Sequence, residues 1–281
     1  MRLPASRYPL RLSLTAVLLA LMPAACGEQR DEPREPVEIH AHRGVTLATA
    51  AGEAVPIHPE NSMTAFRAAH AEGFTVEFDV TLTGDRVPVV MHDATLARTT
   101  SCTGRVDRVS ARAIARCRLD VLGTAGVTAP NPRPERVPTL AEVLDWARAE
   151  GVQLQLEIKS PRLAGVVVEA LDRSGVADDQ VVIKSFLSRN LDVARDAGWR
   201  TALLTSRDRN DDAPDIAERR GFDILSPEWP LPEGFVERAG TRPVVPWTLD
   251  SSGEIGAALR ARVDGIVSNN PELVRALAAD E

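Results

Sequence analysis

Long hydrophobic runs and blocks of basic residues are both absent from this 281-residue chain. No apolar run reaches the roughly 18 residues that a membrane span needs, which excludes an integral membrane protein. The formal net charge of -7 argues against nucleic acid as a partner. Lysine is scarce, since Lys159 and Lys184 are the only lysines among 33 basic residues. The 44% hydrophobic and 26% charged residues are nevertheless typical of a globular chain, which excludes disorder as the main state.

The first thirty residues are typical of a targeting segment. Arginines precede an apolar stretch over 12–22, and small residues then lead to Cys26. This order predicts a signal peptide over 1–25, a tether over 26–36 and a folded domain over 37–281. Cys26 stands where a bacterial lipoprotein carries its lipid, so lipidation and simple cleavage both stay open. We expect an exported protein, either extracellular or periplasmic or anchored at the cell surface, with a lipid on Cys26 as its one link to a membrane.

Export affects the interpretation of the other two cysteines. Outside the reducing cytosol, the even pair Cys102 and Cys117 favours a disulfide. Two free buried thiols are the alternative. A metal site at this pair is not expected, because no histidine or further cysteine lies nearby in the sequence.

Strand-like apolar runs alternate with helical patterns along most of the folded domain. The runs cover residues 37–42, 74–82, 153–159, 181–186, 201–205, 223–226, 244–248 and 264–268. The helical patterns cover residues 62–72, 139–150, 161–174, 188–197, 212–220, 252–262 and 271–279. This alternation predicts an α/β fold with parallel strands, and its length favours a (β/α)8 TIM barrel. An open doubly wound sheet is the alternative, but no glycine-rich phosphate loop follows the first run.

One segment breaks the alternation. The run over 87–92 follows the second strand too closely for a parallel crossover, so the two must form an antiparallel hairpin. We expect the second strand to extend above the barrel mouth and the return strand to bring His92 back towards it. Residues 94–138 are then an insertion that carries the two cysteines.

Polar and apolar side chains alternate along the second and third strands. Because successive strand residues face opposite sides, Glu77, Asp79 and Glu157 share the face opposite the apolar one. The apolar face of a barrel strand packs on helices, so the carboxylates should point inward, where barrel active sites lie. Three converging carboxylates indicate a Mg²⁺ or Ca²⁺ site, since these cations prefer oxygen ligands. The alternative is an ion-pair cluster with Arg43 and Lys159.

All the histidines lie in the first 92 residues. His42 closes the first strand and His92 closes the hairpin, so both should reach the barrel mouth. Imidazole titrates near neutral pH, which suits such a pair to acid and base catalysis. His40 is expected to be structural. The strand position of Lys184 leaves open whether it enters the mouth.

Several short motifs stand in the order seen in one enzyme family. They are Ala41-His42-Arg43-Gly44, Pro59-Glu60-Asn61-Ser62, Glu77-Phe78-Asp79-Val80, Val89-Val90-Met91-His92-Asp93, Arg98-Thr99-Thr100, Pro138-Thr139-Leu140, Glu157-Ile158-Lys159, Ser185-Phe186, Trp247-Thr248 and Asp264-Gly265-Ile266. Through this ordered set the chain resembles the glycerophosphodiester phosphodiesterases over nearly all of the folded domain. The resemblance implies a barrel, a divalent cation, and hydrolysis of a small phosphodiester to glycerol 3-phosphate and an alcohol.

The resemblance also implies roles for single residues. The acid/base pair would be His42 and His92, the metal ligands Glu77, Asp79 and Glu157, and the phosphate or substrate contacts Arg43, Glu60 and Lys159. Trp247 is interpreted either as a wall for the alcohol or as a core aromatic. The connection over residues 45–58 is longer than usual for the family and follows the first strand, which suits a lid or a narrowed substrate range.

Three functions stay open. The first is the phosphodiesterase above, the second a lysophospholipase D-like enzyme on the same barrel, and the third an inactive barrel that binds ligands at the surface. The sequence does not decide which histidine is the acid, nor whether water or the glycerol 2-hydroxyl is the nucleophile.

Overall fold

Strands and helices alternate through the folded part of the chain. The computed structural model describes residues 36–51, 53–124 and 126–280, and these form one unit. The predicted signal peptide, Cys26 and nearly all of the predicted tether lie outside the described residues. Within the described residues, no helix is both long and apolar enough to cross a bilayer.

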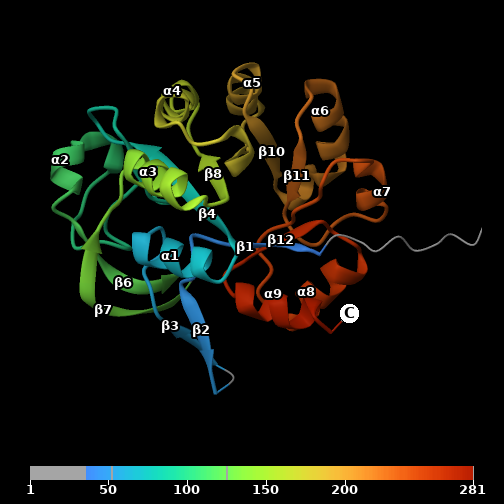
Figure 1. Cartoon of the computed structure of the whole chain (residues 1–281), viewed down its shortest axis with the longest axis horizontal. Helices are drawn as coiled ribbons and strands as arrows, with labels where there is room; N and C mark the ends of the chain where they lie inside the picture. The colour runs from blue at the N-terminus through green and yellow to red at the C-terminus, as the bar shows by residue number, and fades with distance from the viewer. Residues whose placement is uncertain (1–35, 52, 125, 281) are drawn as a thin grey trace, which may run out of the picture. The chain divides into compact units, whose positions relative to one another are not determined.

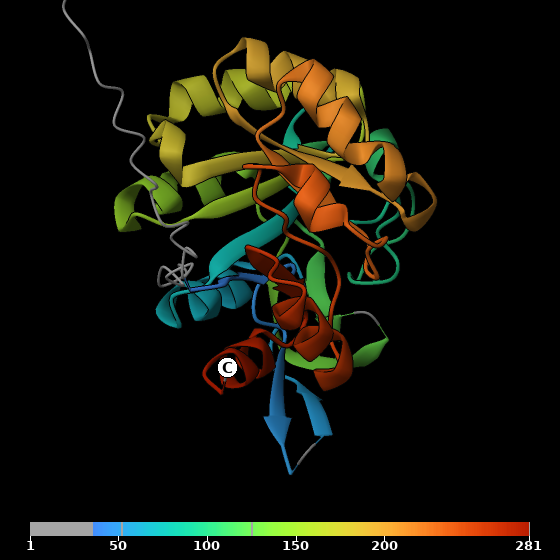
Figure 2. The same ribbon diagram turned by 90° about the vertical axis from the view of Figure 1, so that its right-hand side faces the viewer.

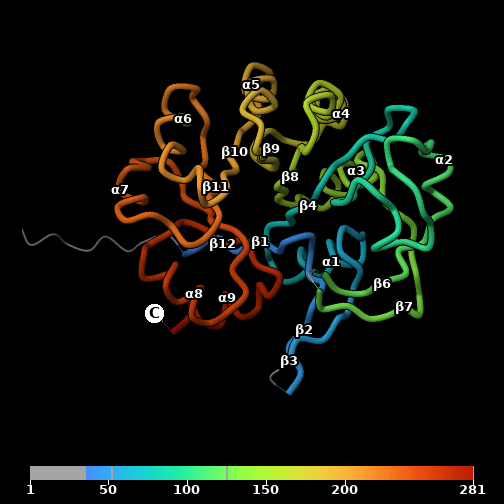
Figure 3. Tube along the Cα trace, turned by 180° about the vertical axis from the view of Figure 1, so that it is seen from behind, coloured from blue at the N-terminus to red at the C-terminus, as the bar shows by residue number. Residues whose placement is uncertain are grey.

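The central sheet is parallel and runs in the order β11-β10-β9-β8-β4-β1-β12. Its strands are β1 (Glu38–Ala41), β4 (Thr75–Leu82), β8 (Leu154–Ile158), β9 (Val181–Ser185), β10 (Arg200–Thr205), β11 (Ile224–Pro227) and β12 (Gly265–Ser268). The helices are α1 (Met63–Ala71), α3 (Leu140–Glu150), α4 (Ala164–Ser174), α5 (Ser188–Asp196), α6 (Ala213–Arg220), α7 (Phe235–Ala239), α8 (Ser252–Arg260) and α9 (Pro271–Ala278). Short 3-10 helices are η2 (Asp178–Gln180) and η3 (Arg207–Asp212). Helices α4, α5 and α6 follow one another along the outside of the sheet (Figures 1 and 3).

The eighth predicted strand, residues 244–248, closes the barrel without becoming a regular strand. The N–H of Val245 donates to the carbonyl of Leu225 in β11 over 2.8 Å. On the other side, the N–H of Val267 in β12 donates to the carbonyl of Pro246 over 3.0 Å. Because proline has no N–H to donate, Pro246 interrupts the ladder. The predicted (β/α)8 barrel is confirmed, with one strand that is irregular at this proline.

Alternate residues of β4 divide between two layers, as their sequence predicts. Val76, Phe78 and Val80 are fully buried in the cluster that joins the sheet to its helices. The side chains between them therefore point into the barrel, where a second apolar cluster fills the interior with Val182, Ala202, Ile224, Val245 and Val267. Figure 2 shows the helices outside the strands from the side.

The hairpin after the second barrel strand is confirmed, because β5 (Pro88–Val90) pairs antiparallel with β4. The insertion over 94–138 contains η1 (Val106–Arg108), α2 (Ala111–Ile114), β6 (Arg118–Thr124) and β7 (Val127–Arg136), the last two as an antiparallel pair. A separate cluster of buried residues holds it together: Val89, Met91, Leu96, Val106, Ile114, Cys117, Leu119 and Val137. Cys102 and Cys117, the pair expected to form a disulfide, are bonded with their Cα atoms 5.5 Å apart.

The connection over 45–58, considered above for a lid or a narrowed substrate range, has regular structure. It forms an antiparallel hairpin of β2 (Leu47–Ala50) and β3 (Glu53–Pro56), drawn in blue at the bottom of Figure 1. Ala51 turns the chain between the strands with a left-handed φ of 52°. The hairpin lies beside the insertion strands β6 and β7. It supplies no residue to the cavities at the mouth of the barrel described below.

Candidate active site

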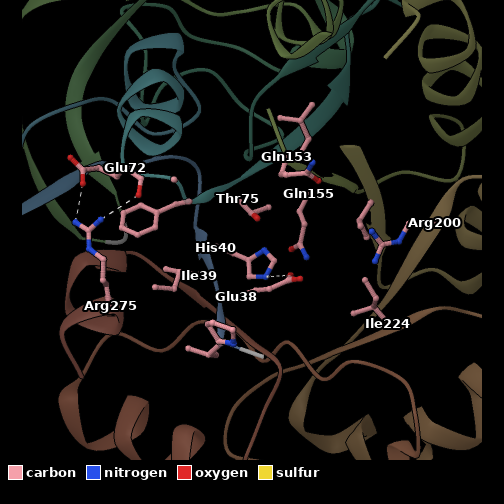
Figure 4. Close-up of a pocket in the computed structure, with 16 residues that line it drawn as sticks. Glu38, Ile39, His40, Glu72, Thr75, Gln153, Gln155, Arg200, Ile224 and Arg275 are labelled. Carbon is pink, nitrogen blue, oxygen red and sulfur yellow. Dashed lines mark hydrogen bonds and ion pairs between the residues drawn. The ribbon is translucent and has the colours of Figure 1, made fainter. Parts of the chain in front are cut away.

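Cavities open at both ends of the barrel. At the N-terminal ends of the strands, a cavity of about 450 Å³ contains His40, which is buried with Nε2 3.3 Å from a Glu38 carboxylate oxygen (Figure 4). At the C-terminal ends, a cavity of about 310 Å³, the central cavity, is lined by His42, Arg43, Glu77, His92, Glu157, Lys159, Lys184, Phe186, Leu204, Trp247 and Thr248. The central cavity brings two histidines together with two buried carboxylates, and active sites of barrel enzymes lie at this end of the strands, which makes it the candidate active site.

Three carboxylates converge at the base of the central cavity. Glu77, Asp79 and Glu157 each place an oxygen within 4.8 Å of the others, and their exposed fractions are 1%, 1% and 8%. The sheet register explains the proximity, because Asp79 of β4 lies directly beside Glu157 of β8. All the ligand atoms that these side chains offer are hard carboxylate oxygens, and all three side chains are buried. The set therefore fits a divalent cation.

Three cationic side chains surround these carboxylates. Lys159 Nζ lies 3.0 Å from Asp79 Oδ1 and 2.8 Å from Glu157 Oε1. Arg43 Nε lies 3.2 Å from the other oxygen of Asp79. Lys184, which the sequence could not assign to either face, points into the barrel with Nζ 3.1 Å from Glu77 Oε1. The ion-pair cluster weighed as an alternative and the possible metal-binding triad thus use the same carboxylates.

The pKa values of the three carboxyls differ because each has different neighbours. Burial would raise the pKa of Glu77, but Lys184 and His42 bring it below its ordinary value. Burial would also raise the pKa of Asp79, but the positive charges of Lys159 and Arg43 hold it far below its usual range. Burial and the negative charge of Asp79 raise the pKa of Glu157 to about 7. Glu157 is thus the carboxylate least satisfied by its surroundings.

A tight turn after β1 sets the position of Arg43. Arg43 and Gly44 have φ values of 60° and 85°, and a Cβ on residue 44 would lie 2.7 Å from the Cβ of Ala65. Glycine is therefore required at position 44. The Arg43 N–H donates to Glu77 Oε2 over 3.0 Å, and its guanidinium donates to Glu60 Oε1 over 2.8 Å. The turn thereby directs Arg43 at the carboxylates.

Glu60, predicted as a substrate contact, lies behind Arg43 and does not line the central cavity. Its side chain is 2% exposed and accepts from Arg43, Arg98 and Thr124. Burial opposes ionisation, but the hydrogen bonds of Arg98 and the charge of Arg43 lower the pKa of Glu60. The position of Glu60 therefore indicates that it orients the Arg43 guanidinium and does not contact substrate.

Both mouth histidines are oriented through Nδ1. His42 Nδ1 lies 2.7 Å from Asn269 Oδ1, while Asn269 Nδ2 donates to Asp250 Oδ2 over 2.7 Å. A carboxylate can only accept, so Asp250 fixes which amide atom faces the ring, and His42 Nδ1 must carry a proton. His92 Nδ1 lies 2.7 Å from Asp93 Oδ1. In both rings Nε2 is left for chemistry.

The charges around His42 act in opposite directions. Burial lowers the pKa of His42 and prevails over Glu77 and Asp79, which raise it. The neutral ring, with the lone pair on Nε2, is therefore favoured. The residues behind the ring, Asn269 and Asp250, were missed by sequence reasoning.

Aromatic side chains form one wall of the central cavity. Phe186 is 44% exposed and meets Trp247 edge to face at 5.5 Å between ring centroids. The Trp247 indole N–H donates to the carbonyl of Ser226 over 2.9 Å, which anchors the ring. Trp247 therefore lies at the cavity surface, which is the wall position considered for it.

Comparison with protein families matches residues 42–273 to the glycerophosphoryl diester phosphodiesterase family. The chain belongs to this family. As a member, it is a phosphoric diester hydrolase, and the predicted resemblance is confirmed.

Individual relatives agree with this membership. The chain is 30% identical over 227 residues to the glycerophosphodiester phosphodiesterase of Caldanaerobacter subterraneus, covering 76% of this chain and 90% of the relative. It is 30% identical over 259 residues to a Mycobacterium tuberculosis protein named probable glycerophosphodiester phosphodiesterase 2, covering 84% and 88%. An Oleispira antarctica phosphodiesterase, solved with the product sn-glycerol-3-phosphate, shares the fold at TM-score 0.72 and 21% identity, covering 88% and 98%.

Proposed function

We propose that this family member hydrolyses glycerophosphodiesters to glycerol 3-phosphate and an alcohol, with a divalent cation and acid/base catalysis by His42 and His92. The observation that carries the proposal is that a cluster of three buried carboxylates, two of which line the central cavity, meets two histidines whose Nε2 atoms have no hydrogen-bond partner among the described residues. Such a set combines a cation site, phosphate-binding charges and proton transfer at one point.

Mg²⁺ or Ca²⁺ would be held by Glu77, Asp79 and Glu157, and would draw charge from a phosphoryl oxygen. Arg43 and Lys159 bind the phosphate at the same end of the barrel, Arg43 as a fork and Lys159 as a point charge. Lys159 then exchanges part of its pairing with the carboxylates for pairing with the phosphate.

The two histidines divide the proton transfers. His42 is kept neutral by burial and carries its lone pair on Nε2, so it removes the proton from the nucleophile. His92 donates from Nδ1 to the Asp93 carboxylate, which suits a ring that carries positive charge, so it protonates the leaving oxygen. Water or the glycerol 2-hydroxyl can serve as nucleophile. Detection of a cyclic phosphate by ³¹P NMR distinguishes the two.

The central test follows release of glycerol 3-phosphate from glycerophosphocholine by protein that lacks residues 1–26. Activity should disappear with EDTA and return with Mg²⁺ or Ca²⁺. His42→Ala and His92→Ala should each lower turnover roughly 10²- to 10⁴-fold. Glu157→Gln removes the charge of a proposed cation ligand and should lower activity. Its matched control is Glu169→Gln, which changes an exposed acid on α4 and should leave activity unchanged. Activity that ignores both EDTA and the histidine substitutions would reject the proposal.

A second candidate substrate class has one observation in its favour. The exposed Phe186 beside Trp247 and Leu204 gives the central cavity an apolar wall. Such a wall suits the acyl part of a lysophospholipid, as in a lysophospholipase D. Comparing turnover of lysophosphatidylcholine and glycerophosphocholine separates the two candidates, whereas inactivity on both would favour a ligand-binding role.

We also propose that the protein is exported and that Cys26 carries a lipid after removal of residues 1–25. The arginines, apolar stretch and small residues before Cys26 support this. The intact mass of the mature protein is the test, because diacylation of Cys26 adds a mass that simple cleavage does not.

A further inference from the structure

A second cavity adjoins the central one and is rich in arginine. It encloses about 510 Å³, and its lining includes Arg86, Arg105, Arg108 and Arg162. We call it the arginine groove. Arg86 comes from the turn between β4 and β5, Arg105 and Arg108 flank or belong to η1 of the insertion, and Arg162 comes from the connection between β8 and α4. Three separate parts of the chain thus bring arginines to one place.

The arginine groove meets the central cavity at two residues of the candidate active site. His92 and Lys159 line both cavities. A substrate whose scissile phosphate is bound by Lys159 and faces His92 therefore has the groove as its immediate neighbour. Anything attached to that phosphate on this side enters the arginine groove.

Positive charge in the arginine groove is mostly unneutralised. Asp107 is the one carboxylate in its lining, and it accepts both hydrogen bonds from Arg105, each 2.9 Å long. The nearby Asp85 accepts from Thr83 and from the N–H of Ala111. Among the described residues, Arg86, Arg108 and Arg162 have no carboxylate partner in an ion pair. Asp107 is also close enough to Arg108 to feel its charge, but four arginines facing one carboxylate still leave a local excess of positive charge on a protein of net charge -7.

The backbone at Arg86 is strained. Its φ of 65° lies in the left-handed region, where glycine or asparagine is more comfortable than arginine. The N–H of Arg86 closes the turn on the carbonyl of Thr83 over 3.0 Å. An arginine kept at a position that suits glycine points to a use for its charge, because strain of this kind gathers at functional sites.

We propose that the arginine groove binds a second phosphate, so that the preferred substrate is a phosphodiester with another phosphate group beyond the scissile one. This inference rests on the proposed function. Guanidinium groups bind phosphate through paired hydrogen bonds, and three of them exceed what a neutral or cationic head group can use. Oligomers of glycerol phosphate and deacylated lipids with two phosphates share this chemistry.

The test compares two substrates that differ by one glycerophosphate unit: glycerophosphoglycerol, with one phosphate, and bis(glycerophospho)glycerol, with two. The groove variant carries Arg86→Gln, Arg108→Gln and Arg162→Gln. The matched control carries Arg189→Gln, Arg219→Gln and Arg260→Gln on α5, α6 and α8, with the same change in charge. In the groove variant, kcat/KM for the two-phosphate substrate should fall roughly ten-fold or more through KM, while the one-phosphate substrate changes far less. The control variant should match wild type on both.

Two further measurements separate the explanations. Arg86→Gly relieves the backbone strain, so it should lose selectivity for the second phosphate without a lower Tm. KM for the two-phosphate substrate should also rise more steeply with salt than KM for the other. Equal loss on both substrates, or no preference by wild type, overturns the inference.

Inactivity of wild type on both compounds would count against the proposed function instead. The inference is then decided by calorimetry with bis(glycerophospho)glycerol. Binding that the groove variant loses supports it, and absence of binding by wild type overturns it.

Discussion

Replacing Asn269 by leucine should slow catalysis without weakening substrate binding. Asn269 holds His42 Nδ1 at 2.7 Å and is held in turn by Asp250, yet it does not line the central cavity. General base catalysis is worth roughly 10²- to 10⁴-fold, and loss of a residue that only orients the base costs part of that, about 10- to 100-fold. This corresponds to roughly 1.4 to 2.7 kcal/mol in the activation barrier.

The assay is steady-state release of glycerol 3-phosphate, with kcat and KM determined separately. In Asn269→Leu, kcat should fall by that factor while KM stays near wild type. A double-mutant cycle with His42→Ala isolates the mechanism. Because Asn269 acts through His42, its loss should have no further effect once the imidazole is gone.

The matched control is Asn131→Leu. It removes a side-chain amide that donates to the carbonyl of Leu119 in the insertion, and it should leave kcat unchanged. Normal kcat in Asn269→Leu would refute the reasoning. So would an undiminished additional loss in the His42→Ala background, since Asn269 would then act elsewhere.

Three other predictions concern stability and pH. Replacing Cys102 and Cys117 by serine removes a cross-link with a sequence separation of 15, which should lower the free energy of opening of the insertion by about 3 kcal/mol in amide hydrogen exchange; unchanged protection would contradict this. At the start of α3, Thr139 and Glu142 form a capping box in which each side chain bonds the other's backbone N–H. Glu142→Ala breaks it and should lower the free energy of unfolding by about 1 kcal/mol, whereas Glu169→Ala on α4 should lower it far less. A hydrogen bond from Arg98 lowers the pKa of Asp93 to about 2, so the pair stabilises the fold above the ordinary carboxyl pKa of about 4. The stability lost in Arg98→Ala should therefore be constant above about pH 4 and shrink as pH falls towards 2, and a loss that grows with acid would argue against this pairing.

The convergence of the three carboxylates could be predicted because its signal is local. Glu77 and Asp79 lie two residues apart on an alternating strand, and Glu157 lies near the end of the next barrel strand, so strand parity together with neighbouring strands places them close together. The barrel and its hairpin follow from similar short-range patterns. The short linker between the two strands was sufficient to predict the antiparallel hairpin, because a parallel crossover needs a longer connection.

Residues whose position depends on distant parts of the chain could not be predicted. Asn269 reaches His42 across 227 positions, and its partner Asp250 lies in a different connection. The residues that precede Lys184 in its strand are apolar on both faces of that strand, so parity does not show which way its side chain points. The direction depends on how the strand pairs with β8. The irregular strand at Pro246 is recognised only through the bonds that its neighbours make with it.

The insertion has a hydrophobic cluster and a disulfide of its own, while His92 sits at the point where this cluster meets the barrel. Regions with separate cores open with separate free energies, which amide hydrogen exchange resolves residue by residue. We therefore expect the insertion and the barrel to unfold under different conditions. We expect heat or a reducing agent to open the insertion and release His92, the proposed acid, while the barrel and most of its circular dichroism persist. Residual activity then reports the integrity of the insertion, and a melting curve reports that of the barrel.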